Sequence, residues 1–254
     1  MATSAAQQLW DARVNASKIP TDFDGQPGSE EDGYALQAAM VAASGEDVIG
    51  WKIGATVAAL FPVLGVSQPF LGPLFQRFTY DSGAEIPILP GHALETEVTV
   101  RLKADLPVRD TAYTRDEIEA AVGAIIPSFE LVGARFEGEL AGAGFKVIAD
   151  GGANVGTVLS SDVTDWGPYD LSDHPVSLTI NGADAIEGSV SVLVWDHVFD
   201  ALSWCLERPA LAPRGLKAGD IVMTGTCTGM TPLNPGDEAV GDFGPMGEVR
   251  ARFV

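Results

Sequence analysis

Glycine and proline divide the chain after Gly45 into a series of short apolar runs. The sequence holds 29 glycines and 16 prolines among 254 residues, so turn-forming residues recur at short intervals. The runs between them are V-I-G-W-K-I-G, A-E-I-P-I-L-P-G, L-E-T-E-V-T-V-R-L, F-K-V-I-A-D-G-G, V-S-L-T-I-N-G, D-I-V-M-T-G-T and E-V-R-A-R-F-V. Many short strands bounded by turn residues predict a β-rich core, either a barrel or folded-over sheets.

The first 45 residues have a different, helical pattern. Two helical stretches are separated there by the proline- and glycine-rich break T-D-F-D-G-Q-P-G-S. Ser29 with Asp32 is a start signal for the second stretch, E-D-G-Y-A-L-Q-A-A-M-V-A-A-S. We therefore expect residues 1–45 to form a helical segment packed on residues 46–254, which form one β-rich structural unit.

Two further helices are expected within the β-rich region. Thr114 with Glu117 forms a capping box that opens R-D-E-I-E-A-A-V-G-A-I-I. The stretch D-H-V-F-D-A-L-S-W-C-L-E-R is amphipathic, with Val198, Leu202 and Cys205 at helical spacing. The sequence thus predicts an α+β, β-rich fold with short helices beside the strands.

Composition excludes several classes of partner and site. The 35 acidic against 15 basic side chains give a formal net charge of −20, which repels phosphate backbones and anionic lipid, so we expect neither nucleic acid nor a membrane as partner. Cys205 and Cys227 are the only cysteines and lack CxxC spacing, which argues against a disulfide framework or a zinc site. The start has no signal-peptide layout, and no apolar run approaches about 18 residues. We expect a soluble, cytoplasmic protein.

Several common catalytic motifs are missing from the sequence. The histidines His92, His174 and His197 form no H-E-x-x-H or paired-histidine zinc pattern. There is no G-x-S-x-G nucleophile elbow, no Walker loop and no G-x-G-x-x-G between a strand and a helix. Nucleotide binding is therefore disfavoured.

Glu95 and Glu97 pose the main question about function. Successive side chains of an extended strand alternate between its faces, so the two glutamates of L-E-T-E-V lie on the same side. A half-buried antiparallel strand with a wet polar face has this alternation. Two ligands of a metal ion have it too, and the strand alone does not distinguish the two interpretations.

Two more charged residues lie within apolar runs. Lys52 lies between Trp51 and Ile53, so in a buried strand its ammonium needs an anionic partner, whereas at a strand end it can reach solvent. Glu130 lies in I-I-P-S-F-E-L-V-G, after a proline that we expect to end the preceding helix. A hard cation such as Mg²⁺ is one partner for such a carboxylate. A salt bridge or an exposed strand edge is the alternative.

An ordered set of motifs resembles one known family. The motifs are S-E-E-D-G-Y-A-L-Q, G-W-K-I-G-A-T, L-G-V-S-Q-P-F-L-G-P-L-F, L-E-T-E-V, P-S-F-E-L-V, I-A-D-G-G-A-N, L-K-A-G-D-I-V-M-T-G-T and a closing P-G-D. Together they resemble the fumarylacetoacetate hydrolase superfamily, from about Ser29 to Val254. Their order and spacing are similar to those of its 2-oxopent-4-enoate hydratase and 4-oxalocrotonate decarboxylase branch. No single motif is specific, whereas the ordered set is.

The resemblance implies a fold and a metal site. The family fold is a rolled, mixed β-sheet or barrel core with short flanking helices. Its site holds Mg²⁺ or Mn²⁺ on three acids, two from an E-x-E strand and one from a later strand. In this sequence those positions are Glu95, Glu97 and Glu130, which favours the metal-ligand interpretation of L-E-T-E-V.

The resemblance also assigns residues that would contact substrate. The strand lysine of the family falls on Lys52, which becomes the catalytic and substrate-binding candidate, and the hydroxyl of the late G-[ST] turn falls on Thr226. The motif I-A-D-G-G-A-N adds Asp150 as a third substrate-binding candidate.

The implied function is a divalent-metal-dependent hydratase, as in the breakdown of aromatic compounds. Such an enzyme adds water to a 2-hydroxy-2,4-dienoate or 2-oxo-enoate to give a 4-hydroxy-2-oxo acid. A small 2-oxo acid can chelate the cation through its carboxylate and its 2-oxo group, while Lys52 supplies further positive charge. A decarboxylase or C–C hydrolase of a related 2-oxo acid and a non-catalytic partner subunit are alternatives. A homo-oligomer is expected, because β-proteins commonly cover their sheet edges by assembly.

Two positions depart from the family pattern. Many hydratases of the family carry an acid two positions after the G-x-L-F turn, whereas G-P-L-F is followed here by Gln76 and Arg77. The guanidinium of Arg77 can bind a second carboxylate of the substrate with two hydrogen bonds, which would favour dicarboxylates. A surface arginine is the alternative. The family's H-P pair before the late helix is replaced by Asp196 and His197.

Overall fold

The computed structural model describes residues 4–212 and 214–254. Its helices are α1 (Ala5–Val14), α2 (Glu30–Ser44), α3 (Leu60–Leu64), α4 (Arg115–Ala121), α5 (Gly144–Ala149) and α6 (Val198–Leu206), with short 3-10 turns η1 (Gln76–Phe78), η2 (Val190–Val192), η3 (Pro209–Leu211) and η4 (Gly244–Met246). Residues 1–3, where the predicted helical segment starts, lie outside the described ranges.

The strands form two sheets. The larger sheet contains β1 (Val48–Gly54), β2 (Phe70–Phe75), β3 (Thr79–Asp81), β5 (Ala93–Leu102), β6 (Val122–Val132), β7 (Asn154–Leu159), β10 (Ile221–Thr226) and β11 (Thr231–Pro232). The smaller sheet contains β4 (Ala84–Ile86), β8 (Pro175–Ile180), β9 (Ile186–Ser189), β12 (Glu238–Asp242) and β13 (Glu248–Phe253).

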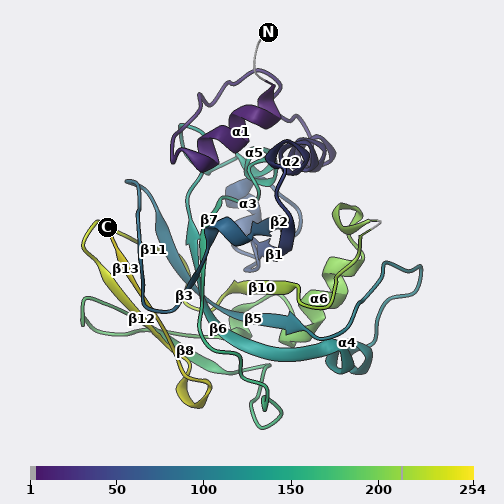
Figure 1. Ribbon diagram of the computed structural model, residues 1–254, viewed down its shortest axis with the longest axis vertical. Helices are drawn as coiled ribbons and strands as arrows, with labels where there is room; N and C mark the ends of the chain where they lie inside the picture. The colour runs from purple at the N-terminus through teal and green to yellow at the C-terminus, as the bar shows by residue number, and fades with distance from the viewer. Residues whose placement is uncertain (1–3, 213) are drawn as a thin grey trace.

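The larger sheet is mixed and curled. Its strand order is β2-β1-β10-β5-β6-β7-β3, with β11 added beside β5. The pairs β1–β10 and β3–β7 are parallel, whereas β1–β2, β10–β5, β5–β6 and β6–β7 are antiparallel. Figure 1 shows β5 and β6 bending across the molecule, with β8, β12 and β13 of the smaller sheet to one side of them. The prediction of an α+β, β-rich fold around a rolled mixed sheet is confirmed.

The main apolar core joins the two sheets to α4 and α6. Phe129 of β6 and Phe253 of β13 are fully buried in it, as is Phe243, which follows β12. A Cβ at Gly241 of β12 would lie only 2.8 Å from the Phe129 ring, so this glycine allows the sheets to approach each other. Burial of such large apolar side chains is the main stabilising contribution to a fold of this kind.

The N-terminal helices pack at one end of the molecule. The Ser29 hydroxyl accepts a hydrogen bond from the Asp32 N–H at 3.1 Å, so the predicted start of α2 is confirmed. The helix ends at Gly45, which adopts the left-handed conformation with φ +67°. Figure 1 shows α1, α2 and α5 together at the top of the view. The division of the chain at residue 45 stays a prediction.

Two secondary-structure predictions are wrong. The helix opened by the Thr114 capping box ends at Ala121, and the apolar run after it is strand β6, in which Pro127 lies. The run F-K-V-I-A-D-G-G was expected to be a strand and instead forms α5. In both places tertiary packing overrides the secondary structure that the local sequence favours. Strand β6 pairs along the full length of β5, and α5 packs on α2. None of the described helices is long and apolar enough to cross a membrane.

Candidate metal and substrate site

Four adjacent strands bring the predicted site residues together. Their order is β1, β10, β5 and β6, so residues far apart in sequence become neighbours on the curled sheet. Glu95 lies directly opposite Glu130, and Glu97 lies directly opposite Thr226. Lys52 comes from β1, on the far side of β10. The sheet register, more than any loop, therefore sets the geometry of the site.

The three glutamates form a buried carboxylate cluster. Each offers an oxygen, and these three oxygens lie within 4.8 Å of one another. Glu130 is 0% exposed and Glu97 is 1% exposed, and Glu95 is buried too. Because both faces of β5 are buried over most of its length, a wet polar face is excluded. The alternation in L-E-T-E-V thus places two carboxylates in the interior.

Lys52 is the cation of this cluster. Its ammonium Nζ lies 3.2 Å from Glu130 Oε1, and both side chains are buried. Burial alone would lower the pKa of Lys52, but the nearby carboxylates, Glu130 foremost, outweigh it and raise that pKa. Lys52 therefore carries its charge at neutral pH. The alternative of a lysine that reaches solvent from a strand end is excluded.

One lysine does not balance three buried carboxylates. Burial, followed by repulsion from Glu130, raises the pKa of Glu95 to about 8, and burial with the same repulsion raises the pKa of Glu97 well above its usual value. Oε2 of Glu130 is buried and has no hydrogen-bond partner among the described residues. Three close oxygens, excess negative charge and an unpartnered carboxylate oxygen fit a hard divalent cation.

A glycine turn at the end of β10 holds Glu97 in place. The Gly225 N–H donates a hydrogen bond to Glu97 Oε2 at 2.8 Å. Gly225 has φ +116°, and a Cβ there would lie 2.0 Å from Thr56 Oγ1, so only glycine fits. Beside it, the buried hydroxyl of Thr226 has no hydrogen-bond partner among the described residues. That hydroxyl lines the cavity in front of the carboxylates and is free to bind a ligand.

Asn154 links the cluster to a buried arginine that sequence reasoning missed. Its Nδ2 donates to Glu130 Oε1 at 3.0 Å, while its Oδ1 accepts from Arg13 Nη2 at 2.8 Å. Arg13 comes from α1 and is separated from Asn154 by 141 residues in sequence. The only signal in the sequence is the N of the I-A-D-G-G-A-N motif, which does not identify its partners.

The structure places Asp150, a predicted substrate-binding residue, away from the cavity beside Lys52. Asp150 is 0% exposed and does not line the cavity beside Lys52. Its carboxylate accepts hydrogen bonds from the backbone N–H of Arg135 at 2.9 Å and from the Arg135 guanidinium. The same guanidinium donates to the carbonyl oxygen of Asn154 at 2.7 Å. Asp150 is therefore a buried counter-ion that fixes the start of β7.

Replacing Asp150 with alanine should lower the free energy of unfolding by about 3–5 kcal/mol, because it leaves the buried Arg135 charge uncompensated. Denaturant unfolding measures the change. Asp162→Ala is the matched control, since Asp162 pairs with Arg101 at the surface, where an ion pair contributes about 0.2–1 kcal/mol. Equal losses in the two variants would contradict the structural role of Asp150.

The structure places Arg77 at the surface, in agreement with the alternative interpretation of that residue. Its side chain is 53% exposed and forms a surface ion pair with Glu46 at 3.4 Å. It lies in η1, next to the end of β2 that pairs with the start of β1, whereas Lys52 and the cavity lie toward the other end of β1. Arg77 therefore cannot reach a ligand beside Lys52. The other departure, Asp196-His197, has a structural explanation, because His197 Nδ1 accepts the Phe199 N–H and caps α6.

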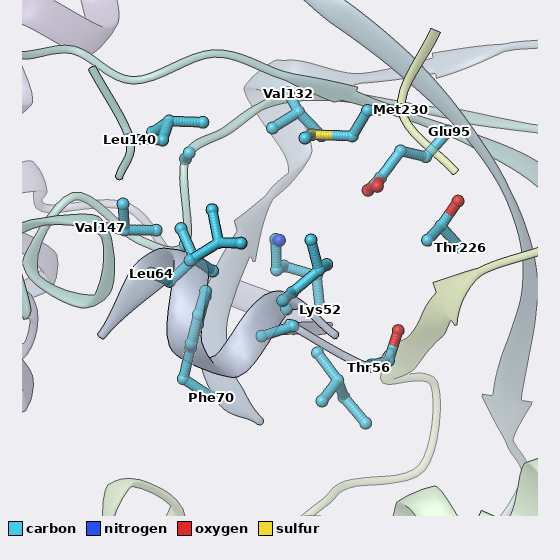
Figure 2. Close-up of a pocket in the computed structure, with 17 residues that line it drawn as sticks. Lys52, Thr56, Leu64, Phe70, Glu95, Val132, Leu140, Val147, Thr226 and Met230 are labelled. Atoms are coloured by element: carbon cyan, nitrogen blue, oxygen red, sulfur yellow. The ribbon is translucent and has the colours of Figure 1, made fainter. Parts of the chain in front are cut away.

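A cavity of about 90 Å³ lies in front of the carboxylate cluster. Figure 2 shows Glu95, Thr226 and Thr56 on one side of it and Lys52 reaching toward its centre. The opposite side is apolar and is formed by Leu64, Phe70, Leu140 and Val147, whereas Met230 lies beside Glu95, with Val132 next to it. Lys52 is the only cation among the described residues that line the cavity. The space therefore has one charged end and one apolar end.

A buried acidic triad beside a lysine, next to a cavity on the curled sheet, could hold a divalent metal ion. Residues 74–254 match the family "Fumarylacetoacetate (FAA) hydrolase C-terminal", and the chain belongs to that family. It is 28% identical to 2-hydroxyhexa-2,4-dienoate hydratase of Comamonas testosteroni, over 91% of this chain and 89% of that protein. It is 29% identical to 2-oxo-hept-4-ene-1,7-dioate hydratase of Escherichia coli, over 88% of this chain and 86% of that protein.

The fold is shared with a solved relative. The structure of 4-oxalocrotonate decarboxylase from Pseudomonas putida G7, complexed with magnesium and adipate, matches with a TM-score of 0.88. That match covers 98% of this chain and 95% of the decarboxylase, at 24% identity. The predicted family and its hydratase and decarboxylase branch are thereby confirmed.

Proposed function

We propose that the protein is a divalent-metal-dependent hydratase of 2-hydroxy-2,4-dienoates, which it converts to 4-hydroxy-2-oxo acids in the catabolism of aromatic compounds. The observation that carries this proposal is the buried triad of Glu95, Glu97 and Glu130 with Lys52 Nζ at 3.2 Å from Glu130. The hydratase relatives support the reaction class. A non-catalytic partner subunit is disfavoured, because a scaffold has no need for three buried, mutually repelling carboxylates at a cavity.

The residues in and beside the cavity have different roles in the proposed reaction. Glu95, Glu97 and Glu130 would hold Mg²⁺ or Mn²⁺, which when bound supplies a chelating centre for the substrate carboxylate and 2-oxo oxygen and stabilises charge on that oxygen. Lys52, charged and enclosed, attracts and orients the anionic end of the substrate. The Thr226 hydroxyl can exchange hydrogen bonds with the substrate or with the attacking water.

The apolar end of the cavity determines which group the substrate can carry at its C5 end. No charged side chain among the described lining residues lies at that end, so a second carboxylate there would be buried without a partner. The C5 end of the dienoate therefore carries hydrogen or a short alkyl group. This replaces the preference for dicarboxylates that Arg77 had suggested.

The test is a panel of 2-hydroxydienoates with and without a terminal carboxylate, with product identification by NMR. With Mg²⁺ present, the C5 and C6 monoacids should give 4-hydroxy-2-oxo acids with a kcat/KM at least about tenfold above that of the diacid, since an unpartnered carboxylate costs several kcal/mol. Arg77→Ala should change neither value by more than about twofold, as expected for an exposed pair. Release of CO₂ in place of hydration would identify a decarboxylase.

A designed variant sharpens this prediction. Leu140→Arg introduces a guanidinium at the apolar end and should bring the kcat/KM of the diacid close to that of the monoacids. Val108→Arg is the control, because Val108 is an exposed apolar residue outside the cavity. A diacid preference in the unmodified protein would overturn the assignment of the tail while leaving the hydratase assignment intact.

We also propose that the protein works as a cytoplasmic homo-oligomer. The edge strand β9 of the smaller sheet is largely exposed, and Ile186 within it is 38% exposed. Exposed edges and apolar side chains of this kind favour assembly. Light scattering on the purified chain measures the molar mass directly.

A further inference from the structure

A second cavity, of about 180 Å³, lies behind β7 on the side of α1. Four basic side chains contribute to its wall, namely Arg13, Lys18, His92 and Arg135, and we call it the basic cavity. None of the described residues that line it is acidic, although the chain as a whole carries a formal charge of −20. Any of these side chains that is charged and buried needs compensation from a partner.

Arg13 is the least compensated of these groups. It is 5% exposed, and its guanidinium lies 5.1 Å from the centroid of the Phe75 ring and 4.8 Å from that of Phe78. Its single hydrogen bond among the described residues goes to Asn154, and its Nε and Nη1 have no partner there. Arg135, in contrast, has Asp150 as its counter-ion. The wall of the cavity thus retains the charge of Arg13 and of the exposed Lys18.

His92 adds an unused hydrogen-bond donor. Its Nδ1 accepts the Leu89 N–H at 3.2 Å, so the proton of the neutral ring is on Nε2. Burial, and after it the charges of Lys18 and Arg135, lower the pKa of His92 to about 4, so the ring is neutral at physiological pH. No described group accepts a hydrogen bond from Nε2, and the ring packs where a Cβ at Gly133 would lie 2.4 Å from it.

The remaining wall is apolar. Side chains of Val14, Phe78, Tyr80, Ile86, Leu89 and Val155 contribute to it. A strongly hydrated anion such as inorganic phosphate would lose its water against these groups, whereas the hydrocarbon part of an organic acid would pack on them. The cavity is also large enough for more than a single bound water.

From these observations we propose that the basic cavity is a second binding site, separate from the metal site, for a small organic carboxylate with a short apolar body. The carboxylate accepts the His92 Nε2–H and lies in the field of Lys18 and Arg13. This proposal does not depend on the reaction that the protein catalyses.

Ligand binding in the basic cavity should change the affinity of the metal site for its ion. Arg13 is hydrogen-bonded to Asn154 at 2.8 Å, and Asn154 is hydrogen-bonded to Glu130 at 3.0 Å. An anion that attracts Arg13 therefore shifts the group that orients Glu130. By linkage, the metal at Glu130 must alter the affinity of the basic cavity by the same factor.

The experiment uses butyrate as the probe and compares the unmodified protein with Lys52→Met, both in excess Mg²⁺, in which the variant is expected to stay folded. The chain has only three histidines, and the ring signals of His92 should shift saturably in NMR spectra recorded at constant ionic strength. Chloride should produce no such shift, and inorganic phosphate should bind more weakly than butyrate. A shift of the His92 signals that is lost in Lys52→Met would place the butyrate in the catalytic cavity and overturn the proposal.

Two variants measured by calorimetry complete the test. His92→Phe keeps the shape of the ring but removes its donor, and should weaken butyrate binding about tenfold or more, as expected for a hydrogen bond to a charged group. Lys18→Gln should weaken it about two- to fivefold, while Lys103→Gln, at an exposed lysine elsewhere, should not. Undiminished binding in the His92 variant, or equal effects of the two lysine variants, would refute the site.

Discussion

Lys52→Met should lower kcat by about two orders of magnitude or more while the protein stays folded in Mg²⁺, because it removes a positioned charge from the reacting end of the cavity. The lysine is enclosed: a Cβ at Gly152 would lie 3.0 Å from its Cδ and Cε. An arginine is larger and places its charge on a planar guanidinium instead of an ammonium, so we expect that Lys52→Arg does not restore activity. Steady-state kinetics together with thermal unfolding followed by circular dichroism measures both quantities.

The Lys52→Met variant should also change the stability of the protein, in a way that depends on the metal. The Lys52–Glu130 ion pair is buried, so removing the lysine leaves Glu130 without its cation, a change that costs about 3–5 kcal/mol when nothing else compensates it. A bound dication compensates it. Lys52→Met should therefore be clearly less stable than the unmodified protein in chelator and close to it in excess Mg²⁺.

Lys146→Met is the matched control for both readouts. Lys146 is a lysine of α5 that donates a hydrogen bond to the Thr21 carbonyl oxygen at 2.8 Å and takes no part in the carboxylate cluster. Its replacement should leave kcat unchanged. If Lys52→Met retained full kcat, Lys52 would be only a structural counter-ion of Glu130, and the proposed role in substrate binding would fail.

The central strands of the site could be predicted from sequence because their signals are local. Lys52 within V-I-G-W-K-I-G and the glutamates of L-E-T-E-V are charged residues in otherwise apolar strands, and a buried charge needs a partner. Their meeting depends on strand order, which the sequence does not show, and the family resemblance instead implied directly that the three glutamates share a metal site. Once β10 lies between β1 and β5, the register places Thr226 opposite Glu97 without further information.

The hydrogen bonds that support the site could not be predicted, because nothing in the sequence indicates which residues pair with one another. Arg13 and Asn154 meet only when α1 folds back over β7, 141 residues later. Arg77 shows the converse error, since a departure from a family motif identifies a position without giving the direction in which its side chain points. The short helix α5 was missed for a related reason: six residues give too little periodicity to overcome the β-like composition of F-K-V-I-A.

Glu97→Gln should weaken Mg²⁺ binding by about two orders of magnitude or more, since it removes one of three carboxylate ligands and its charge. The neutral amide can still accept the Gly225 N–H, so the fold should persist. Glu46→Gln, which changes a partly exposed glutamate paired with Arg77, is the matched control and should bind Mg²⁺ normally. Calorimetry on chelator-treated proteins measures both affinities, and equal Mg²⁺ binding by Glu97→Gln and the unmodified protein would exclude Glu97 as a ligand.

The same carboxylates predict how pH acts on the metal and on stability. In the metal-free fold the pKa of Glu95 is raised from 4.5 to about 8, and the pKa of Glu97 is raised well above its usual value. The folded state therefore binds protons more tightly than the unfolded chain. The contribution of these two groups to metal-free stability is greatest below about pH 4.5, and it falls as the pH rises toward 8.

Mg²⁺ must displace those protons, so its affinity should rise from pH 6 to pH 8, by up to about tenfold per pH unit for each proton released. On folding at pH 8 the Glu97 carboxyl must either be buried with its charge or take up a proton, and Glu97→Gln removes this cost. Its metal-free form should therefore melt at a higher Tm than the metal-free unmodified protein at pH 8. A Mg²⁺ affinity that does not change with pH would mean that metal binding releases no protons, and it would contradict the raised pKa values of Glu95 and Glu97.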